Sequence, residues 1–194
     1  MDKFLIAPTF LRLVKEGRFF RTVFAWILRI QSGLAILAGL LVSIELWKQA
    51  SGLSTASILG LIVLQLTLIV TVYLVSHLSW LRATDLLAMS ETQADPISVT
   101  RLLLKLSGEI YASILAPLSV GGALLIWISA GEAGDTLRVL FSTLLPVAGG
   151  SVFQTGLTIL GMGLTMAACS LLGAYALAAF IGLFVSIEQN TRKG

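Results

Sequence analysis

Few residues of this chain have side chains that could do chemistry. The sequence holds a single cysteine, Cys169, and a single histidine, His77. One chain therefore lacks the paired thiols or clustered imidazoles that a zinc site, a redox cysteine pair or a two-histidine cofactor clamp needs. It also lacks the GxSxG, HExxH, CxxC, P-loop and Rossmann patterns of common catalytic sites. We therefore predict no enzymatic activity, no catalytic residue, no resident cofactor and no metal site.

Three ionisable residues fall at one expected depth, just inside a membrane boundary marked by aromatic residues: Arg29, His77 and Glu109. Ionisable side chains are costly inside a membrane, so their placement calls for a reason. We predict a boundary polar layer in which Glu109 pairs with Arg29 or with His77. The alternative is that each side chain reaches separately toward the lipid head groups, with Glu109 directed toward Lys105 one helical turn earlier.

The composition indicates in what environment these three ionisable residues lie. Hydrophobic residues make up 57% of the 194 residues, charged residues only 12%, and the mean hydropathy is +0.95. A water-soluble domain of this size carries about twice that share of charge. Because only a helix satisfies its own backbone hydrogen bonds in lipid, the chain is predicted to be an all-α, polytopic membrane protein.

The gaps between charged residues set the expected spans, since a hydrocarbon core of about 30 Å needs about 20 apolar residues. We predict one membrane domain with four transmembrane helices, at residues 24–47, 57–81, 108–130 and 160–187. The connecting parts are a basic amphipathic leader with an interfacial helix at 1–23, a cytoplasmic loop at 82–107, an outer segment with a short interfacial or re-entrant helix at 131–159, and a cytoplasmic tail at 188–194. An alternative interpretation makes residues 137–153 a fifth span, which would put the C-terminus on the opposite side.

Basic residues predict the orientation. In the four-span arrangement, eleven of the 13 lysines and arginines fall on one side. The positive-inside rule then places both termini in the cytoplasm. Four cations of the leader are expected to anchor it on the anionic inner leaflet: Arg12, Lys15, Arg18 and Arg21. The alternative is an ordinary positive flank that fixes topology and does nothing more.

Small residues recur at every fourth position in three of the spans, which lets helix backbones approach closely in lipid. The longest strip is Ser170, Ala174, Ala178, Gly182 and Ser186; the span at 24–47 has Gln31, Ala35, Gly39 and Ser43; the span at 108–130 has Gly108, Ala112 and Ala116. We predict that these strips are helix-packing interfaces, either within the chain or with other chains. The span at 57–81 is mostly bulky and aliphatic, so we expect it to face lipid most.

Two functions fit this pattern. The preferred one is a non-catalytic integral membrane subunit that acts by helix packing, as a scaffold, assembly or stabilising component of a larger membrane complex or homo-oligomer. Its expected partners are other membrane-protein subunits or copies of itself and anionic inner-leaflet lipids, and no nucleic acid. The alternative is a small transporter or channel that uses a kink at Pro117 and the neutral polar residues Gln65, Thr67 and Thr71.

The two ends of the chain carry a resemblance. The leader opens with Phe4-Leu5-Ile6-Ala7-Pro8-Thr9, and the last span ends with Ile187-Glu188-Gln189-Asn190-Thr191-Arg192. Together they resemble the two ends of a bacterial inner-membrane family of unknown function, over about the first 46 and the last 20 residues. The chain departs from that family by having two further spans between the matched ends. The resemblance implies a bacterial inner-membrane location and implies no activity.

Overall fold

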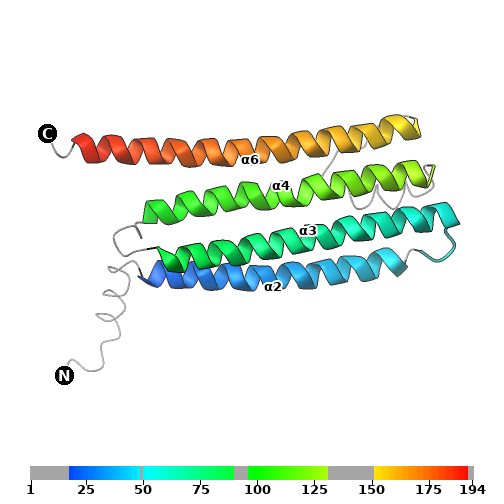
Figure 1. Cartoon of the computed structure of the whole chain (residues 1–194), viewed down its shortest axis with the longest axis horizontal. Coiled ribbons are helices and arrows are strands. Elements are labelled where there is room, and N and C mark those ends of the chain that lie inside the picture. Colours follow the sequence, from blue (N-terminus) through cyan, green and yellow to red (C-terminus); the bar gives the residue numbers. More distant parts are fainter. Residues whose placement is uncertain (1–17, 49, 90–95, 131–150, 192–194) are drawn as a thin grey trace, which may run out of the picture.

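A computed structural model describes residues 18–48, 50–89, 96–130 and 151–191. Their regular structure is entirely helical and consists of four long helices, whose arrangement can be followed in Figure 1. The helices are α2 (Arg18–Lys48), α3 (Thr55–Ala88), α4 (Pro96–Ile128) and α6 (Val152–Thr191). Each of the four is long and apolar enough to cross a membrane. The chain is therefore a multi-pass, all-α membrane protein.

Local chemistry sets where the helices begin. Ser54 caps α3 by accepting a hydrogen bond from the backbone N–H of Ser57 at 3.3 Å. Ser151 and Gln154 form a reciprocal capping box at the start of α6, because each side chain accepts from the backbone N–H of the other, at 3.3 and 3.1 Å. Pro96 opens α4, a position where its missing N–H costs no helical hydrogen bond. These signals start the helices sharply at the ends of the bundle.

The four helices form an open row in chain order. α2 packs against α3, α3 against α4, and α4 against α6, while α2 and α6 lie at the two edges of the row (Figure 1). Successive helices run antiparallel, so the start of α2 and the end of α6 lie at the same end of the molecule (Figure 1). Among the described helices, each edge helix consequently packs mainly on one side.

Burial follows this arrangement and corrects one expectation. In the most apolar stretch of each helix, 39% of the residues of α4 and 33% of those of α3 are buried, against 17% in α2 and 11% in α6. The expectation that residues 57–81 face lipid most is wrong, because α3 lies inside the row despite its bulky side chains. Those side chains build an apolar cluster at each end of the row, centred on Leu64 and Leu125 at one end and on Ala83 and Leu86 at the other.

The helices extend further than the predicted spans. Most of the expected loop at 82–107 is helical, because α3 continues to Ala88 and α4 already begins at Pro96. Likewise, α2 takes in residues 18–23 of the predicted leader, and α6 takes in residues 152–159 and continues to Thr191. Charged residues mark where a chain leaves the hydrocarbon, and a helix does not have to end there. At a rise of 1.5 Å per residue, α3 is about 51 Å long, well beyond the about 30 Å of the hydrocarbon core.

The packing of α4 against α6 also bears on the number of spans. Trp127, near the end of α4, donates a hydrogen bond from Nε1 to the carbonyl of Phe153 at 3.4 Å, and its ring lies against Gly156. The end of α4 and the start of α6 are therefore neighbours at one end of the row. A single additional crossing over residues 137–153 would separate them to opposite ends. Residues 131–150, with the predicted interfacial or re-entrant helix, lie outside the described residues.

Pro117 lies inside α4, which continues from Pro96 to Ile128. Just beyond it, Gly121 faces Thr67 of α3 so closely that a β-carbon at this position would collide with the threonine hydroxyl. The stretch of α4 that the proline weakens is thus held against α3 by close packing.

Candidate functional site

Three helices meet at one buried carboxylate, Glu109 of α4. Arg82 of α3 donates from Nε to Glu109 Oε2 at 3.0 Å and makes a second ion-pair contact with Oε1. Tyr175 of α6 donates its hydroxyl to the same Oε1 at 2.6 Å. Arg82 also pairs with Asp85 on its own helix, from Nη1 to Oδ2 at 3.0 Å. We call Arg82, Glu109 and Tyr175 the clamp, because together they tie α3, α4 and α6.

The clamp corrects the predicted polar layer. Glu109 pairs with Arg82, and Arg29 and His77 do not contact it. The predicted spans put Arg82 in a loop, since it follows Trp80 at the expected membrane boundary. Continuing the helix past that tryptophan would have placed a cation level with Glu109. The alternative partner, Lys105, instead places its Nζ 5.2 Å from the centre of the Tyr175 ring.

Arg29 lies on the other side of α3, between two tryptophans. The central carbon of its guanidinium is 5.5 Å from the ring centre of Trp26 and 5.3 Å from that of Trp80. These are cation–π distances. Its Nε is buried and has no hydrogen-bond partner, and no carboxylate of the described residues pairs with it. His77 stacks on Tyr73 one turn earlier, with ring centres 5.5 Å apart.

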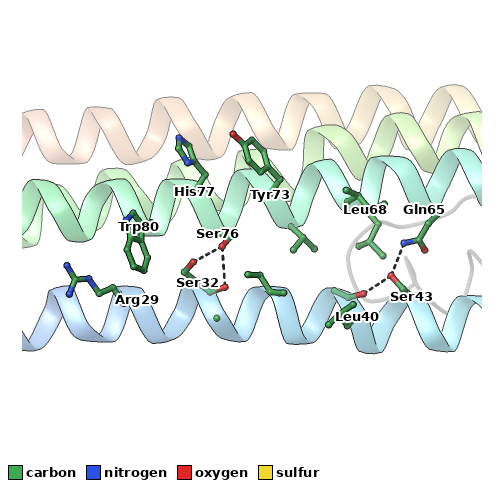
Figure 2. A pocket seen from close by; sticks show the side chains of 15 residues that line it. Arg29, Ser32, Leu40, Ser43, Gln65, Leu68, Tyr73, Ser76, His77 and Trp80 are labelled. Atoms are coloured by element: carbon green, nitrogen blue, oxygen red, sulfur yellow. Dashed lines mark hydrogen bonds between the residues drawn. The ribbon is translucent and has the colours of Figure 1, made fainter.

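Arg29 stands at one end of a groove between α2 and α3. The groove has a volume of about 830 Å³, is partly open, and is lined by residues of both helices (Figure 2). Its walls are mainly aliphatic, with polar groups at intervals along its length. We call it the α2–α3 groove, and we take it as the candidate functional site because it joins an apolar cavity to an unpaired cation.

Two hydrogen-bonded pairs cross this groove (Figure 2). Ser32 and Ser76 share a hydrogen bond at 2.6 Å. Further from Arg29, Gln65 donates from Nε2 to Ser43 Oγ at 2.9 Å, and Ser43 donates to the carbonyl of Gly39 at 2.8 Å. The other amide atom, Gln65 Oε1, is buried without a partner. The pairs fix how far apart the two helices stand.

Glycine positions explain why the groove stays open. At Gly39, a β-carbon would collide with the side chain of Val72, so the helices touch there. At Gly33, one turn beyond Arg29, a β-carbon would meet nothing within 4 Å. The space beside Gly33 is therefore part of the groove.

The strip predicted in the last span lies largely against α4. Ala174 and Ala178 are buried, and Gly108 of α4 faces Ala174. Arg101 donates from Nε to the carbonyl of Ala178 at 3.0 Å, and its guanidinium lies against Gly182. Ser170 is half-buried and Ser186 is exposed. The middle of this strip, at Ala174 and Ala178, is thus covered within the chain.

The strip predicted in the first span lies partly against α3. Gly39 is buried, while Ala35 and Ser43 are half-buried, and Ser43 is held by Gln65. Arg12 and Lys15 of the predicted lipid anchor lie outside the described residues. Arg18 is the first residue of α2, and Arg21 donates a hydrogen bond to the carbonyl of Met89, just after α3.

A second small-residue strip lies on α6 and is absent from the sequence prediction. It consists of four exposed residues at every fourth position, which we call the outer strip: Gly161, Thr165, Cys169 and Gly173. A β-carbon at Gly161 or Gly173 would meet nothing within 4 Å. The same spacing that singled out Ser170 and its neighbours could have found the outer strip, but spacing alone does not tell which strip a neighbouring helix covers.

Within the described residues, no three His, Cys, Asp or Glu side chains gather in a way that could hold a metal ion. Comparison with protein families, with curated proteins and with solved structures found no match. The resemblance of the two chain ends to a bacterial inner-membrane family thus stays a prediction. The geometry of the chain itself carries the functional argument.

Proposed function

We propose that the chain is a non-catalytic membrane subunit that assembles or stabilises a larger membrane complex, or an oligomer of itself, through helix packing. The observation that carries this proposal is the open row, in which α6 packs mainly on α4 among the described helices. The inner face of α6 is used within the chain. Within the described part of the chain, its outer face is exposed and can accept another helix.

The outer strip supplies the surface for that contact. In lipid, the hydrophobic effect does not drive helices together, so association depends on close van der Waals packing, which small residues at every fourth position allow. Gly161 and Gly173 are the two positions of the strip without a side chain, and both face open space. A partner helix would lie along Gly161, Thr165, Cys169 and Gly173.

The transporter alternative has less support from the geometry. Of the neutral polar residues in the predicted second span, Thr67 faces Gly121 and Thr71 donates to the carbonyl of Thr67 at 2.8 Å. These groups serve packing between α3 and its neighbours. Gln65 lines the α2–α3 groove, where its Nε2 donates to Ser43 across the two helices (Figure 2).

Location and orientation belong to the same proposal. We place the chain in a bacterial inner membrane with both termini in the cytoplasm, supported by the eleven basic residues on that side and by the resemblance of the chain ends. The leader is proposed to be a basic amphipathic anchor, and the segment before α6 is proposed to lie at the outer interface. The start of α2 and the end of α6 at one end of the row agree with this orientation.

The proposal is tested by filling the outer strip. Gly161→Leu and Gly173→Leu together should release partner chains, so that the mass of the complex purified in mild detergent falls to that of the 20.7 kDa chain with its detergent. Gly33→Leu is the matched control, because it adds the same side chain in open space on α2 and should leave the complex intact. A wild-type chain that already runs alone and moves solute in liposomes would favour the transporter.

A further inference from the structure

We propose that the α2–α3 groove binds one anionic phospholipid, with the phosphate on the guanidinium of Arg29 and one acyl chain along Gly33, Ile36 and Leu40. This site is separate from the outer strip of α6, which lies at the opposite edge of the row (Figure 1). It is therefore independent of the proposed protein contact.

The first argument is the unpaired charge of Arg29. Arg29 is half-buried, and a guanidinium N–H withdrawn from water is costly when no acceptor satisfies it. The described residues offer Arg29 two aromatic rings and no carboxylate, and its Nε is left without an acceptor. A phosphate accepts two parallel hydrogen bonds from the terminal nitrogens of a guanidinium, so it supplies the missing negative charge.

The second argument is the depth of Arg29. Trp26 and Trp47 lie 21 residues apart on α2, about 31 Å at helical rise, which matches the thickness of the hydrocarbon core. Trp26 and Trp80 therefore mark one interface, where indole rings prefer to lie. Arg29 is one turn from Trp26 and is flanked by both rings. Its backbone therefore lies just inside the hydrocarbon boundary, and its long side chain can reach outward to a lipid phosphate.

The third argument is the shape of the groove beyond Arg29. Gly33, Ile36 and Leu40 line it on α2, and Ile69 and Val72 line it on α3. From Arg29 to Leu40 the groove runs about 16 Å along the helix, close to the about 15 Å depth of one leaflet. The open space at Gly33 leaves room for a chain next to the head group. An acyl chain fits this space, whereas a free anion would use only its Arg29 end.

Titration with lipids in mild detergent, read by native mass spectrometry, tests the proposal. The wild-type chain should bind one phosphatidylglycerol about tenfold more tightly than phosphatidylcholine with the same acyl chains. Both lipids carry the phosphate, but phosphatidylcholine also places a trimethylammonium cation beside the guanidinium of Arg29. Arg29→Gln should abolish the preference, and Arg29→Lys should keep part of it. Gly33→Leu should weaken the binding of both lipids by filling the acyl-chain path.

Three controls separate a specific lipid site from misfolding and from simple anion binding. Gly173→Leu, on the far edge, should bind both lipids as the wild type does, and thermal melting confirms that each variant is folded. Gly33→Leu adds its side chain in open space, so it is expected to fold. It therefore still tests the acyl-chain path if an Arg29 variant does not fold. Inorganic phosphate at equal concentration should not displace the lipid.

Four results would overturn the proposal. They are equal affinity of the wild type for both lipids, unchanged binding in Gly33→Leu, displacement by inorganic phosphate, and a wild-type dimer that Gly33→Leu converts to a monomer. The last result would identify a second copy of the chain as the occupant. Loss of the complex in the outer-strip variants is measured separately, so the two proposals can fail independently.

Discussion

The contact between α4 and α6 is closed, whereas the contact between α2 and α3 is open, although both use small residues at helical spacing. Across the closed contact, Gly108 faces Ala174 and Gly163 faces Ser119, so a glycine on one helix meets a small residue on the other. Across the open contact, Gly39 meets the branched side chain of Val72, and Gly33 meets nothing. The α4–α6 contact is therefore close at both of these glycines, whereas the α2–α3 contact is close at Gly39 and open at Gly33.

The two contacts also differ in whether the polar side chains beside them have partners. Beside the closed contact, Arg82 and Tyr175 satisfy the buried carboxylate of Glu109. Beside the open contact, Arg29 has no partner carboxylate in the described part of the chain, and Gln65 leaves its Oε1 unpaired. One contact is complete within the chain, and the other has room and polar groups for a further molecule.

The largest expected effect comes from breaking the clamp. Glu109→Gln leaves Arg82 without its buried partner and should lower the free energy of unfolding by about 3 kcal/mol. Arg29→Gln, at the open contact, should change it by less than about 1 kcal/mol, because only cation–π contacts are lost. Unfolding in mixed micelles with increasing denaturing detergent measures both. Equal losses would remove the distinction between the two contacts.

A smaller loss of stability should follow when a large side chain is added at a glycine in the closed contact. Gly108→Leu forces a side chain into Ala174 and the backbone of Ser170, which should cost about 2 to 3 kcal/mol. Gly33→Leu adds the same side chain to open space and should change stability by at most about 0.5 kcal/mol. Melting temperatures of the two variants provide the check, and a Gly33→Leu variant as unstable as Gly108→Leu would show that the groove is filled by the chain itself.

The smallest losses of unfolding free energy are expected when a single hydrogen bond is removed. Tyr175→Phe removes the hydroxyl that donates to Glu109 and should cost about 1.5 kcal/mol, because the acceptor is charged. Ser32→Ala removes a bond between two neutral hydroxyls and should cost about 0.6 kcal/mol. The same unfolding assay ranks them. A Ser32→Ala loss as large as that of Tyr175→Phe would mean that the open contact is held as tightly as the closed one.

Much of the fold follows from the sequence, because the gaps between charges report how many stretches can stay in hydrocarbon. The helix ends do not follow in the same way, since Arg82 and Lys105 mark a change of solvent within helices that continue. The pairing of Glu109 with Arg82 escapes prediction for the same reason. Which strip of α6 is covered, and whether Gly33 faces a neighbour, depend on how each helix is rotated about its axis. A single sequence carries no direct record of that rotation.

Cross-linking at the two edges tests the central claim most directly. A photoactivatable cross-linker on Cys169, the single cysteine and an exposed residue of the outer strip, should form adducts with protein chains in native membranes. The same probe on Gly33→Cys in a Cys169→Ser background should form adducts with lipid. Lipid adducts alone at position 169 would contradict the account, because α6 would then present its outer strip to the bilayer and to no partner.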